Sequence, residues 1–229
     1  MGEIRKINHF TGEDMGSAGH IDAKDIAGKP FICVYGEVAP RVTGNQTIVE
    51  KSLSGGVKAY VRFETSDKVN ETIGTAGTFV ATKENTEALG YDDIDILWGE
   101  AVNTMLGYGV SLKTMTQTMA AMMGIDAEVL PPSPSDHMYV AHLNSHSGQL
   151  GAGIMAVPCM LEEIREKIGD FYLLPSSKHE IICVPDQIER PDIKSLKEIV
   201  KAVNAESVSA EDLLSEGVWY VDSEGLHEA

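Results

Sequence analysis

Three histidines and one aspartate lie close together near the middle of the chain, where they could ligate zinc or another divalent metal. They are Asp136, His137, His142 and His146. On a strand, His142 and His146 share a face, whereas His137 has the opposite parity. The helical His-Glu-x-x-His spacing does not occur either. The pattern therefore favours polar residues beside a hairpin, and it leaves Asp136, His142 and His146 as the candidate metal ligands.

A second group has the residue types of nucleophilic catalysis: Ser176, Ser177, His179 and Glu180. Neighbours in sequence rarely assemble a catalytic triad, and no Gly-x-Ser-x-Gly elbow occurs. A turn after Pro175, with serine hydroxyls bonding nearby backbone amides, explains them as well. If a catalytic site exists here, its candidates are Ser177, His179 and Glu180. A hydrolase would combine His179 and Glu180 with His142 and His146.

Two other patterns have structural explanations. Gly148, Gly151 and Gly153 are expected between two strands, and no lysine follows them as in a phosphate loop, so we read a hairpin turn and predict no cofactor. The methionines from Met115 to Met123 have helical spacing. That spacing is typical of core packing, although such a row can also form an adaptable binding groove.

These residues must be positioned by strands and helices that the hydrophobic pattern predicts. Strands are expected at 31–38, 46–50, 57–64 and 78–82, and 57–64 alternates most clearly. Helices are expected at 83–89, at 94–106 and from a Ser111 cap to Met123. Asp92, Asp93 and Asp95 could act as acid and base in glycoside hydrolysis, but negative charge at a helix start explains them without chemistry.

The C-terminal part has a regular order of short elements. We predict strands at 138–143, 153–157, 171–174, 180–184 and 218–221, helices at 161–168 and 193–203, and a short helix capped by Ser209 and Asp212. Short connections favour a mainly antiparallel sheet with helices on one face, an α+β fold with a ββαββα-like C-terminal half. We expect a β-rich region at 1–77 with a loose leader and an α+β domain at 78–229, or one unit formed by both.

The charge distribution excludes one class of function. The chain has 229 residues and a net charge of −17. Phosphate recognition depends on Lys and Arg, so direct nucleic-acid binding is excluded, and a basic protein partner is favoured. The expected partner-binding acidic face contains Glu84, Glu87, Asp92, Asp93, Asp95, Glu211, Asp212 and Glu216.

The compartment follows from the cysteines and from hydropathy. No stretch approaches the roughly 20 apolar residues that cross a bilayer, and the first residues lack an apolar signal core. Cys33, Cys159 and Cys183 are odd in number, far apart and flanked by apolar residues, as buried reduced thiols are. We predict a cytoplasmic protein without membrane contact.

From about Thr78 to Glu224 the chain resembles an uncharacterised bacterial family, the domain of unknown function five-six-eight-eight. The most specific part of the resemblance is the string Leu174-Pro175-Ser176-Ser177-Lys178-His179-Glu180. It is supported by Met122-Met123-Gly124, Met138-Tyr139-Val140, Glu166-Lys167-Ile168-Gly169, Glu211-Asp212-Leu213-Leu214-Ser215 and Tyr220-Val221-Asp222. The resemblance implies a bacterial protein of the kind carried on mobile elements, and it implies no activity.

Three classes of function remain. The first is a non-catalytic binding or regulatory protein whose acidic face engages a basic protein, in its sharpest form an inhibitor that mimics nucleic acid and blocks a nucleic-acid-binding enzyme. The second is a hydrolase, which requires the histidines and Glu180 to meet in one pocket. The third is an accessory module that self-associates through an exposed strand edge.

Overall fold

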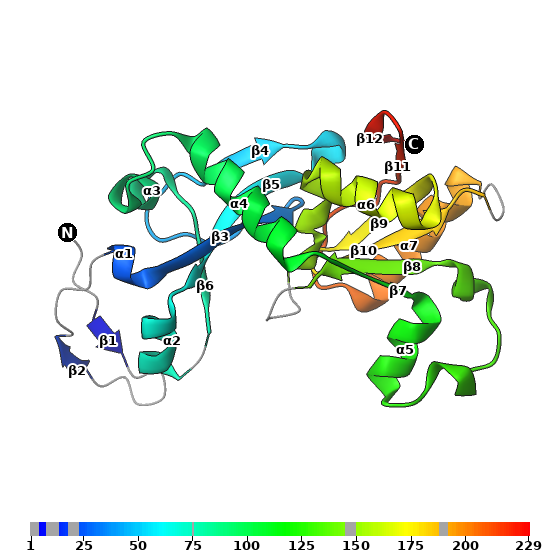
Figure 1. The fold of residues 1–229 in the computed structure, drawn as a ribbon, viewed down its shortest axis with the longest axis horizontal. Coiled ribbons are helices and arrows are strands. Elements are labelled where there is room, and N and C mark those ends of the chain that lie inside the picture. Colours follow the sequence, from blue (N-terminus) through cyan, green and yellow to red (C-terminus); the bar gives the residue numbers. More distant parts are fainter. Residues whose placement is uncertain (1–4, 8–13, 18–22, 75, 145–149, 188–191) are drawn as a thin grey trace.

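The computed structural model describes residues 5–7, 14–17, 23–74, 76–144, 150–187 and 192–229. Within them, two antiparallel sheets lie side by side, and a long helix, α4, crosses the first sheet and leads toward the second (Figure 1). A small separate ribbon pairs β1 (Arg5–Ile7) with β2 (Asp14–Ser17). The predicted α+β class with mainly antiparallel pairing is confirmed.

The first sheet has the order β3-β5-β4, and β6 also pairs with β5. Its strands are β3 (Ala27–Tyr35), β4 (Glu50–Ser52), β5 (Lys58–Thr65) and β6 (Thr78–Val80). The strand predicted at 57–64 is confirmed and Ala59, Val61 and Phe63 are buried, but Tyr60, expected on the opposite, outer face, is buried as well. The boundary between two regions that the sequence suggests at residue 78 falls at the first residue of β6. Because β6 pairs with β5, the first sheet contains strands from both sides of this boundary.

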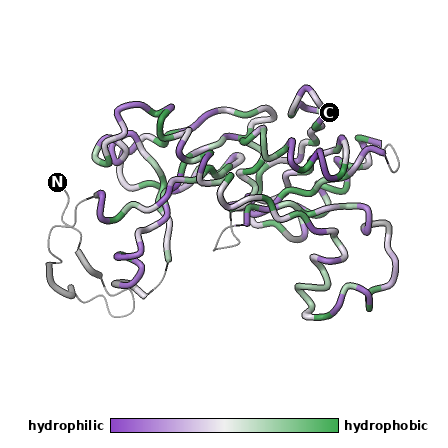
Figure 2. Tube along the Cα trace, viewed as in Figure 1, coloured by the Kyte–Doolittle hydropathy of each residue, from purple (hydrophilic) through white to green (hydrophobic). Residues whose placement is uncertain are grey.

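Short helical elements surround this sheet. They are α1 (Ala23–Ile26), η1 (Ser54–Gly56), α2 (Asp67–Ile73) and α3 (Lys83–Leu89). The start of α3 is fixed by a capping box between Thr82 and Asn85, in which each side chain accepts from the other's backbone N–H. Figure 2 shows that α2 is largely hydrophilic, whereas hydrophobic and hydrophilic segments alternate along the strands of this half.

Helix α4 (Ile94–Tyr108) joins the two halves of the molecule. Asp93 caps its first turn, and the apolar face predicted from periodicity buries Leu97, Ala101 and Met105. Its packing against β3 includes a contact in which the Ile32 N–H donates to the Met105 sulfur at 3.3 Å. One buried cluster extends from Phe31 to Val221 and contains residues of both sheets.

The second sheet has the order β12-β11-β9-β10-β8-β7. Its strands are β7 (Val110–Thr114), β8 (Tyr139–Leu143), β9 (Phe171–Ser177), β10 (Glu180–Pro185), β11 (Trp219–Asp222) and β12 (Gly225–Glu228). Helix α6 (Pro158–Ile168) joins the main cluster with Leu173, and α7 (Ile193–Ser207) covers Leu174. Consecutive strand residues point to opposite faces, so helices cover both faces rather than one.

Four predicted elements were wrong. The strand expected at 46–50 overlaps β4 only at Glu50, and before it Ile48 makes an isolated bridge to Thr82. Residues 153–157 are not a strand: η4 (Gly151–Ala156) is a 3-10 helix whose Gly153 lies directly against the Ile32 backbone carbonyl. The helix expected from Ser111 begins later, because 110–114 pairs with β8 and Thr114 caps α5 (Met115–Met123). Ser209 and Asp212 form a turn, not a helix.

The remaining described elements are short 3-10 helices. They are η2 (Ala127–Val129) and η3 (Pro134–His137).

In the described parts of the chain, no helix has the length and apolar character needed to cross a membrane. All three cysteines are free; Cys33 and Cys183 are buried as predicted, but Cys159 is exposed on α6.

Candidate functional site

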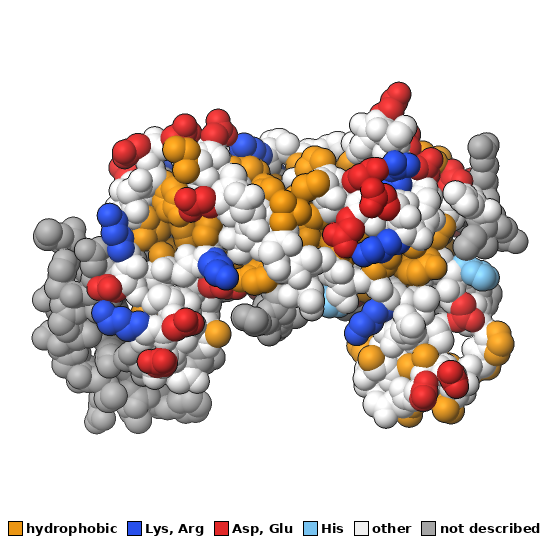
Figure 3. Space-filling model, viewed as in Figure 1, with side chains coloured by type: hydrophobic (Ala, Val, Ile, Leu, Met, Phe, Trp, Pro, Cys, Tyr) orange, Lys and Arg blue, Asp and Glu red, His pale blue; other side chains and the backbone are white. Residues whose placement is uncertain are grey.

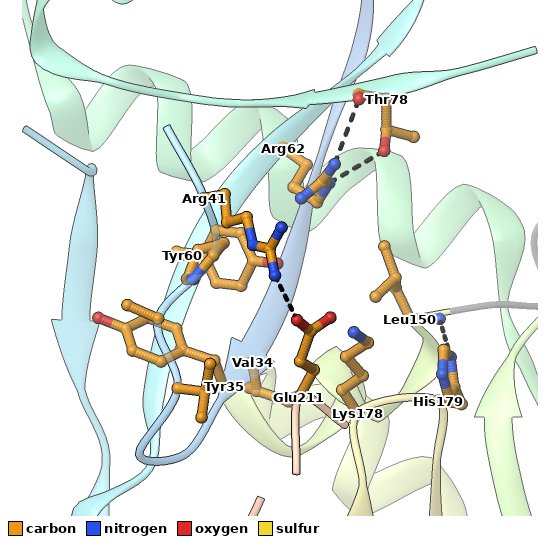
Figure 4. A pocket seen from close by; sticks show the side chains of 13 residues that line it. Val34, Tyr35, Arg41, Tyr60, Arg62, Thr78, Leu150, Lys178, His179 and Glu211 are labelled. Carbon is orange, nitrogen blue, oxygen red and sulfur yellow. Dashed lines mark hydrogen bonds and ion pairs between the residues drawn. The ribbon is translucent and has the colours of Figure 1, made fainter. Parts of the chain in front are cut away.

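A cavity of about 490 Å³ lies between the first sheet and the hairpin that joins β9 to β10 (Figure 4). The first sheet contributes residues of β3 and β5 and the loop after β3, and the hairpin contributes its two turn residues, Lys178 and His179. The lining residues are Val34, Tyr35, Val38, Ala39, Pro40, Arg41, Tyr60, Arg62, Thr78, Leu150, Lys178, His179 and Glu211. We call this cavity the cleft.

Cationic side chains enter the cleft from three separate segments: Arg41, Arg62 and Lys178. Arg62 is held in place because its Nε donates to Thr78 Oγ1 at 3.0 Å and its Nη2 to the Thr78 carbonyl at 3.2 Å. Arg41 pairs with Glu211 at 2.6 Å. In a chain with a net charge of −17, the cleft therefore gathers three cations, two of which are paired with carboxylates.

Lys178 and Asp212 form a second ion pair of 2.6 Å beside the cleft. The hydrogen bond from Lys178, followed by one from the Ser209 hydroxyl at 2.7 Å, lowers the pKa of Asp212 below its ordinary value. Asp212 therefore stays ionised at neutral pH and fixes the ammonium group of Lys178 at the edge of the cleft.

His179 uses both of its ring nitrogens in contacts with the protein. The Leu150 N–H donates to Nδ1 at 3.2 Å, so in the neutral ring the proton lies on Nε2. Nε2 is 3.5 Å from an Asp212 carboxylate oxygen. The same arrangement places Leu150 at φ 61°, the only positive φ of a non-glycine residue in the described ranges. Such strain is commonly found at functional sites.

Cys33 and Tyr60 are buried next to the cations of the cleft, at the β3–β5 pairing. Burial raises the pKa of the Cys33 thiol to about 12, although Arg62 and Lys178 act in the opposite direction. Burial likewise raises the pKa of the Tyr60 phenol. Both groups therefore remain protonated at neutral pH and are poor nucleophiles.

A sequence comparison assigns the chain to a family. The model of the family of unknown function DUF5688 matches residues 60–223. The chain belongs to DUF5688. The resemblance inferred from the C-terminal motifs is thereby confirmed, and the match begins earlier than the expected residue 78. No curated protein and no solved structure matches the chain significantly. In this DUF5688 chain, Arg62, Lys178, His179 and Glu211 lie inside the matched region and Arg41 precedes it.

Of the predicted catalytic residues that the structure describes in this DUF5688 protein, His179 alone lines the cleft. The Ser177 hydroxyl accepts the His179 backbone N–H at 3.0 Å, which is a turn contact. Glu180 lies next to Ile181 of the main cluster, so strand alternation directs it to the opposite face of the sheet. The structure therefore does not bring Glu180 and Ser177 together with the His179 ring.

The two predicted metal ligands that the structure describes, Asp136 and His142, each contact local partners. His142 alternates with the buried Ala141 and Leu143, and its Nδ1 lies 3.1 Å from the Leu143 carbonyl. Asp136 accepts hydrogen bonds from the Thr116 hydroxyl and the Ser133 N–H, which lower its pKa. His146 lies outside the described residues. Among the residues that the structure does describe, no three His, Cys, Asp or Glu side chains could hold one metal ion.

The predicted acidic face of this DUF5688 member is distributed over three places. Glu84, Glu87, Asp92, Asp93 and Asp95 belong to α3 and the start of α4, a region where Figure 3 shows acidic and hydrophobic side chains together. Glu211 and Asp212 pair with cations at the cleft. Glu216 pairs with Lys201 of α7 at 3.4 Å.

Several acids in the first of these places also have local partners. Glu84 accepts the Thr47 N–H at 3.1 Å, and Asp95 pairs with Lys51 at 3.1 Å. Asp93 is the α4 cap, one residue later than Asp92, where the sequence pattern places the start of the helix. Part of the acidic surface therefore serves local structure.

Sequence reasoning missed the cations of the cleft in this DUF5688 chain. Arg41 and Arg62 are brought to Lys178 only by the packing of the two sheets, so no spacing in the sequence links them. The one available signal was local: Lys178 and His179 occupy a two-residue turn, where side chains are free to serve a site.

Proposed function

We propose that this DUF5688 chain is a non-catalytic binding protein of the cytoplasm whose cleft takes a ligand with an oxyanion group, a carboxylate or a phosphate. The observation that carries the proposal is the convergence of Arg41, Arg62 and Lys178 on one cavity. Guanidinium groups match the geometry of oxyanions and can bind them through two parallel hydrogen bonds. Free, buried Cys33 and Cys183 support a reducing compartment.

The contacts around His179 support binding over catalysis. A general base needs a free lone pair, but Nδ1 of His179 already accepts from Leu150 and Nε2 faces Asp212. The nearby Cys33 thiol and Tyr60 phenol are held in their protonated forms. The groups that remain available to a ligand are charged and suited to hold an anion.

Calorimetric titration with inorganic phosphate and with acetate tests the proposal. We expect binding that weakens as salt is raised, because ions screen exposed charges. The double variant Arg62→Gln, Lys178→Gln should lose at least tenfold in affinity. The matched control is Lys194→Gln, which removes an exposed lysine of α7 outside the cleft. Failure of the native protein to bind either anion, or equal binding by the double variant, would contradict the proposal.

A second candidate function uses the acidic region of α3 and α4. Ile96, in the first turn of α4, has 59% of its surface exposed beside these acids. Many protein interfaces have apolar residues at the centre and a polar or charged rim. The partner would be a basic, nucleic-acid-handling protein, and the chain would act as an acidic inhibitor of bacterial mobile-element origin.

An affinity pull-down at low salt and at roughly 0.5 M salt, where exposed charges are screened, tests this second function. The bait is compared with a Glu87→Lys, Asp92→Lys variant, which leaves the Asp93 cap intact. Recovery of one basic protein by the native bait at low salt only would support the inhibitor. Recovery of the protein itself alone would favour a self-associating module.

A further inference from the structure

A second cavity, of about 670 Å³, adjoins the cleft at its cationic end. Arg41, Arg62 and Thr78 line both cavities, so they form the boundary between them. The rest of the second cavity is lined by Ile26, Val42, Thr43, Gln46, Thr65, Phe79, Val80, Asn85 and Leu89. We call it the side chamber. Its size lies within the range of about 300–1,000 Å³ that small-molecule sites occupy.

Apolar groups dominate the walls of the side chamber. Phe79 stacks on Phe63 of the core with ring centroids 5.3 Å apart. This contact holds the Phe79 ring in one orientation. Val80 and Leu89 come from β6 and the end of α3, and Val42 comes from the loop that also carries Arg41. The chamber therefore places hydrocarbon surface directly beside two guanidinium groups.

The polar side chains of the side chamber have partners within the protein. Asn85 accepts the Thr82 N–H at 2.9 Å and donates to the Val80 carbonyl at 2.8 Å. The Thr65 hydroxyl lies 3.0 Å from the Gly77 carbonyl and also contacts Asn70. Because these groups are committed, a ligand in the chamber would gain mainly from apolar burial rather than from hydrogen bonds.

The two arginines at the boundary differ in how they are held. Arg62 is fixed by two hydrogen bonds to Thr78. The side chain of Arg41 is 90% exposed and pairs with Glu211, whose side chain is 63% exposed. An exposed pair of this kind is weak, so an incoming oxyanion can replace Glu211 as the partner of Arg41.

From this arrangement we infer that the ligand is an amphipathic carboxylate, with its head between Arg41 and Arg62 and a hydrocarbon chain in the side chamber. The inference rests on the proposed oxyanion-binding function and names the ligand class of the same site. Arg62 orients the head group, and Phe79 and Leu89 contact the chain. Glu211 competes for Arg41 until the head group displaces it.

The test is a calorimetric titration of the native protein with straight-chain carboxylates from acetate to decanoate, each below the concentration at which it forms micelles. We expect Kd to fall by about two- to fourfold for each added methylene, the gain from burying one methylene group, until the chamber is full. A Kd that is independent of chain length would overturn the inference while leaving the oxyanion site standing. Absence of binding by every carboxylate and by phosphate would remove the proposed function as well.

Variants separate the head-group contacts from those of the chain. Leu89→Gln should abolish the dependence on chain length and leave acetate affinity unchanged, and Leu89→Ala is the milder substitute if the first fails to fold. Arg62→Gln should weaken every member of the series by a similar factor. The matched control is Ile199→Gln, an exposed apolar residue of α7 outside both cavities. Equal chain-length dependence in Leu89→Gln, Leu89→Ala and Ile199→Gln would contradict the placement of the chain.

Discussion

Arg41 and Glu211, 170 positions apart in the sequence, form an ion pair of 2.6 Å at the mouth of the cleft. We predict that Glu211→Gln binds inorganic phosphate several-fold more tightly than the native protein, because it removes the carboxylate that competes for Arg41. Since exposed ion pairs contribute about 0–1 kcal/mol, the free energy of unfolding should change little. Calorimetry and urea denaturation measure the two effects.

The control for Glu211→Gln is Glu216→Gln, which neutralises a carboxylate paired with Lys201 outside the cleft. Both variants change the net charge equally, so a general charge effect would raise phosphate affinity in both. An increase confined to Glu211→Gln assigns the effect to the cleft, and unchanged or weaker binding contradicts the role of Glu211 as competitor.

Leu150 adopts φ 61° while its N–H is bound by His179. In this region a residue with a Cβ is strained by roughly 1–2 kcal/mol, and glycine is not. Leu150→Gly and Leu150→Ala both remove the side chain, but only glycine relieves the strain. We therefore predict that the glycine variant is more stable than the alanine variant by about 1 kcal/mol in urea denaturation. The opposite order would show that the backbone conformation costs little.

Gly153 and Gly99 should respond in opposite ways to alanine. A Cβ on Gly153 would lie 2.0 Å from the Ile32 carbonyl oxygen, so η4 and β3 would have to separate. We expect Gly153→Ala to lower the free energy of unfolding by about 1–3 kcal/mol. Gly99 lies inside α4, and beyond the backbone of that helix no atom lies within 4 Å of the place that an added methyl group would take. Gly99→Ala should therefore raise the free energy of unfolding by about 0.5–1 kcal/mol. Comparable urea midpoints for both variants would contradict the close approach of η4 to β3.

Asp212 makes stability depend on pH in the acidic range. Its bonds with Lys178 and Ser209 lower its folded-state pKa below the ordinary 3.8, so the unfolded chain binds the proton more readily. The stabilisation is therefore present above about pH 4 and is lost as the pH falls through the folded-state pKa. In urea denaturation at constant ionic strength, the stability difference between the native protein and Asp212→Asn should shrink from pH 6 to pH 3. A constant difference would mean that the Asp212 carboxylate is not specifically stabilised by folding.

The sequence pattern predicted an element correctly where the residues of that element alone determine its conformation. The strand at 57–64 and helix α4 were predicted because their apolar residues recur at the period of their own backbone geometry. Residues 112–114 were assigned to a helix capped by Ser111, but their short apolar pattern suits either state, and pairing of 110–114 with β8 decides for a strand. Gly153 was wrongly assigned to a strand. The Ile32 carbonyl, which excludes a side chain at this position, is far away in sequence, so the local pattern does not show the contact.

The sequence by itself determined the α+β class and the DUF5688 membership, since both depend on local patterns. It also predicted a turn before β10, but placed it at Pro175 and the two serines, which belong to β9, whereas the turn is formed by Lys178 and His179. Only the tertiary structure decided that Arg41, Arg62 and Lys178 share a cavity and that Glu211 and Asp212 are ion-pair partners there rather than part of an acidic face. The physical reason is that charge attracts through space, and packing of the two sheets brings together groups that no sequence spacing relates.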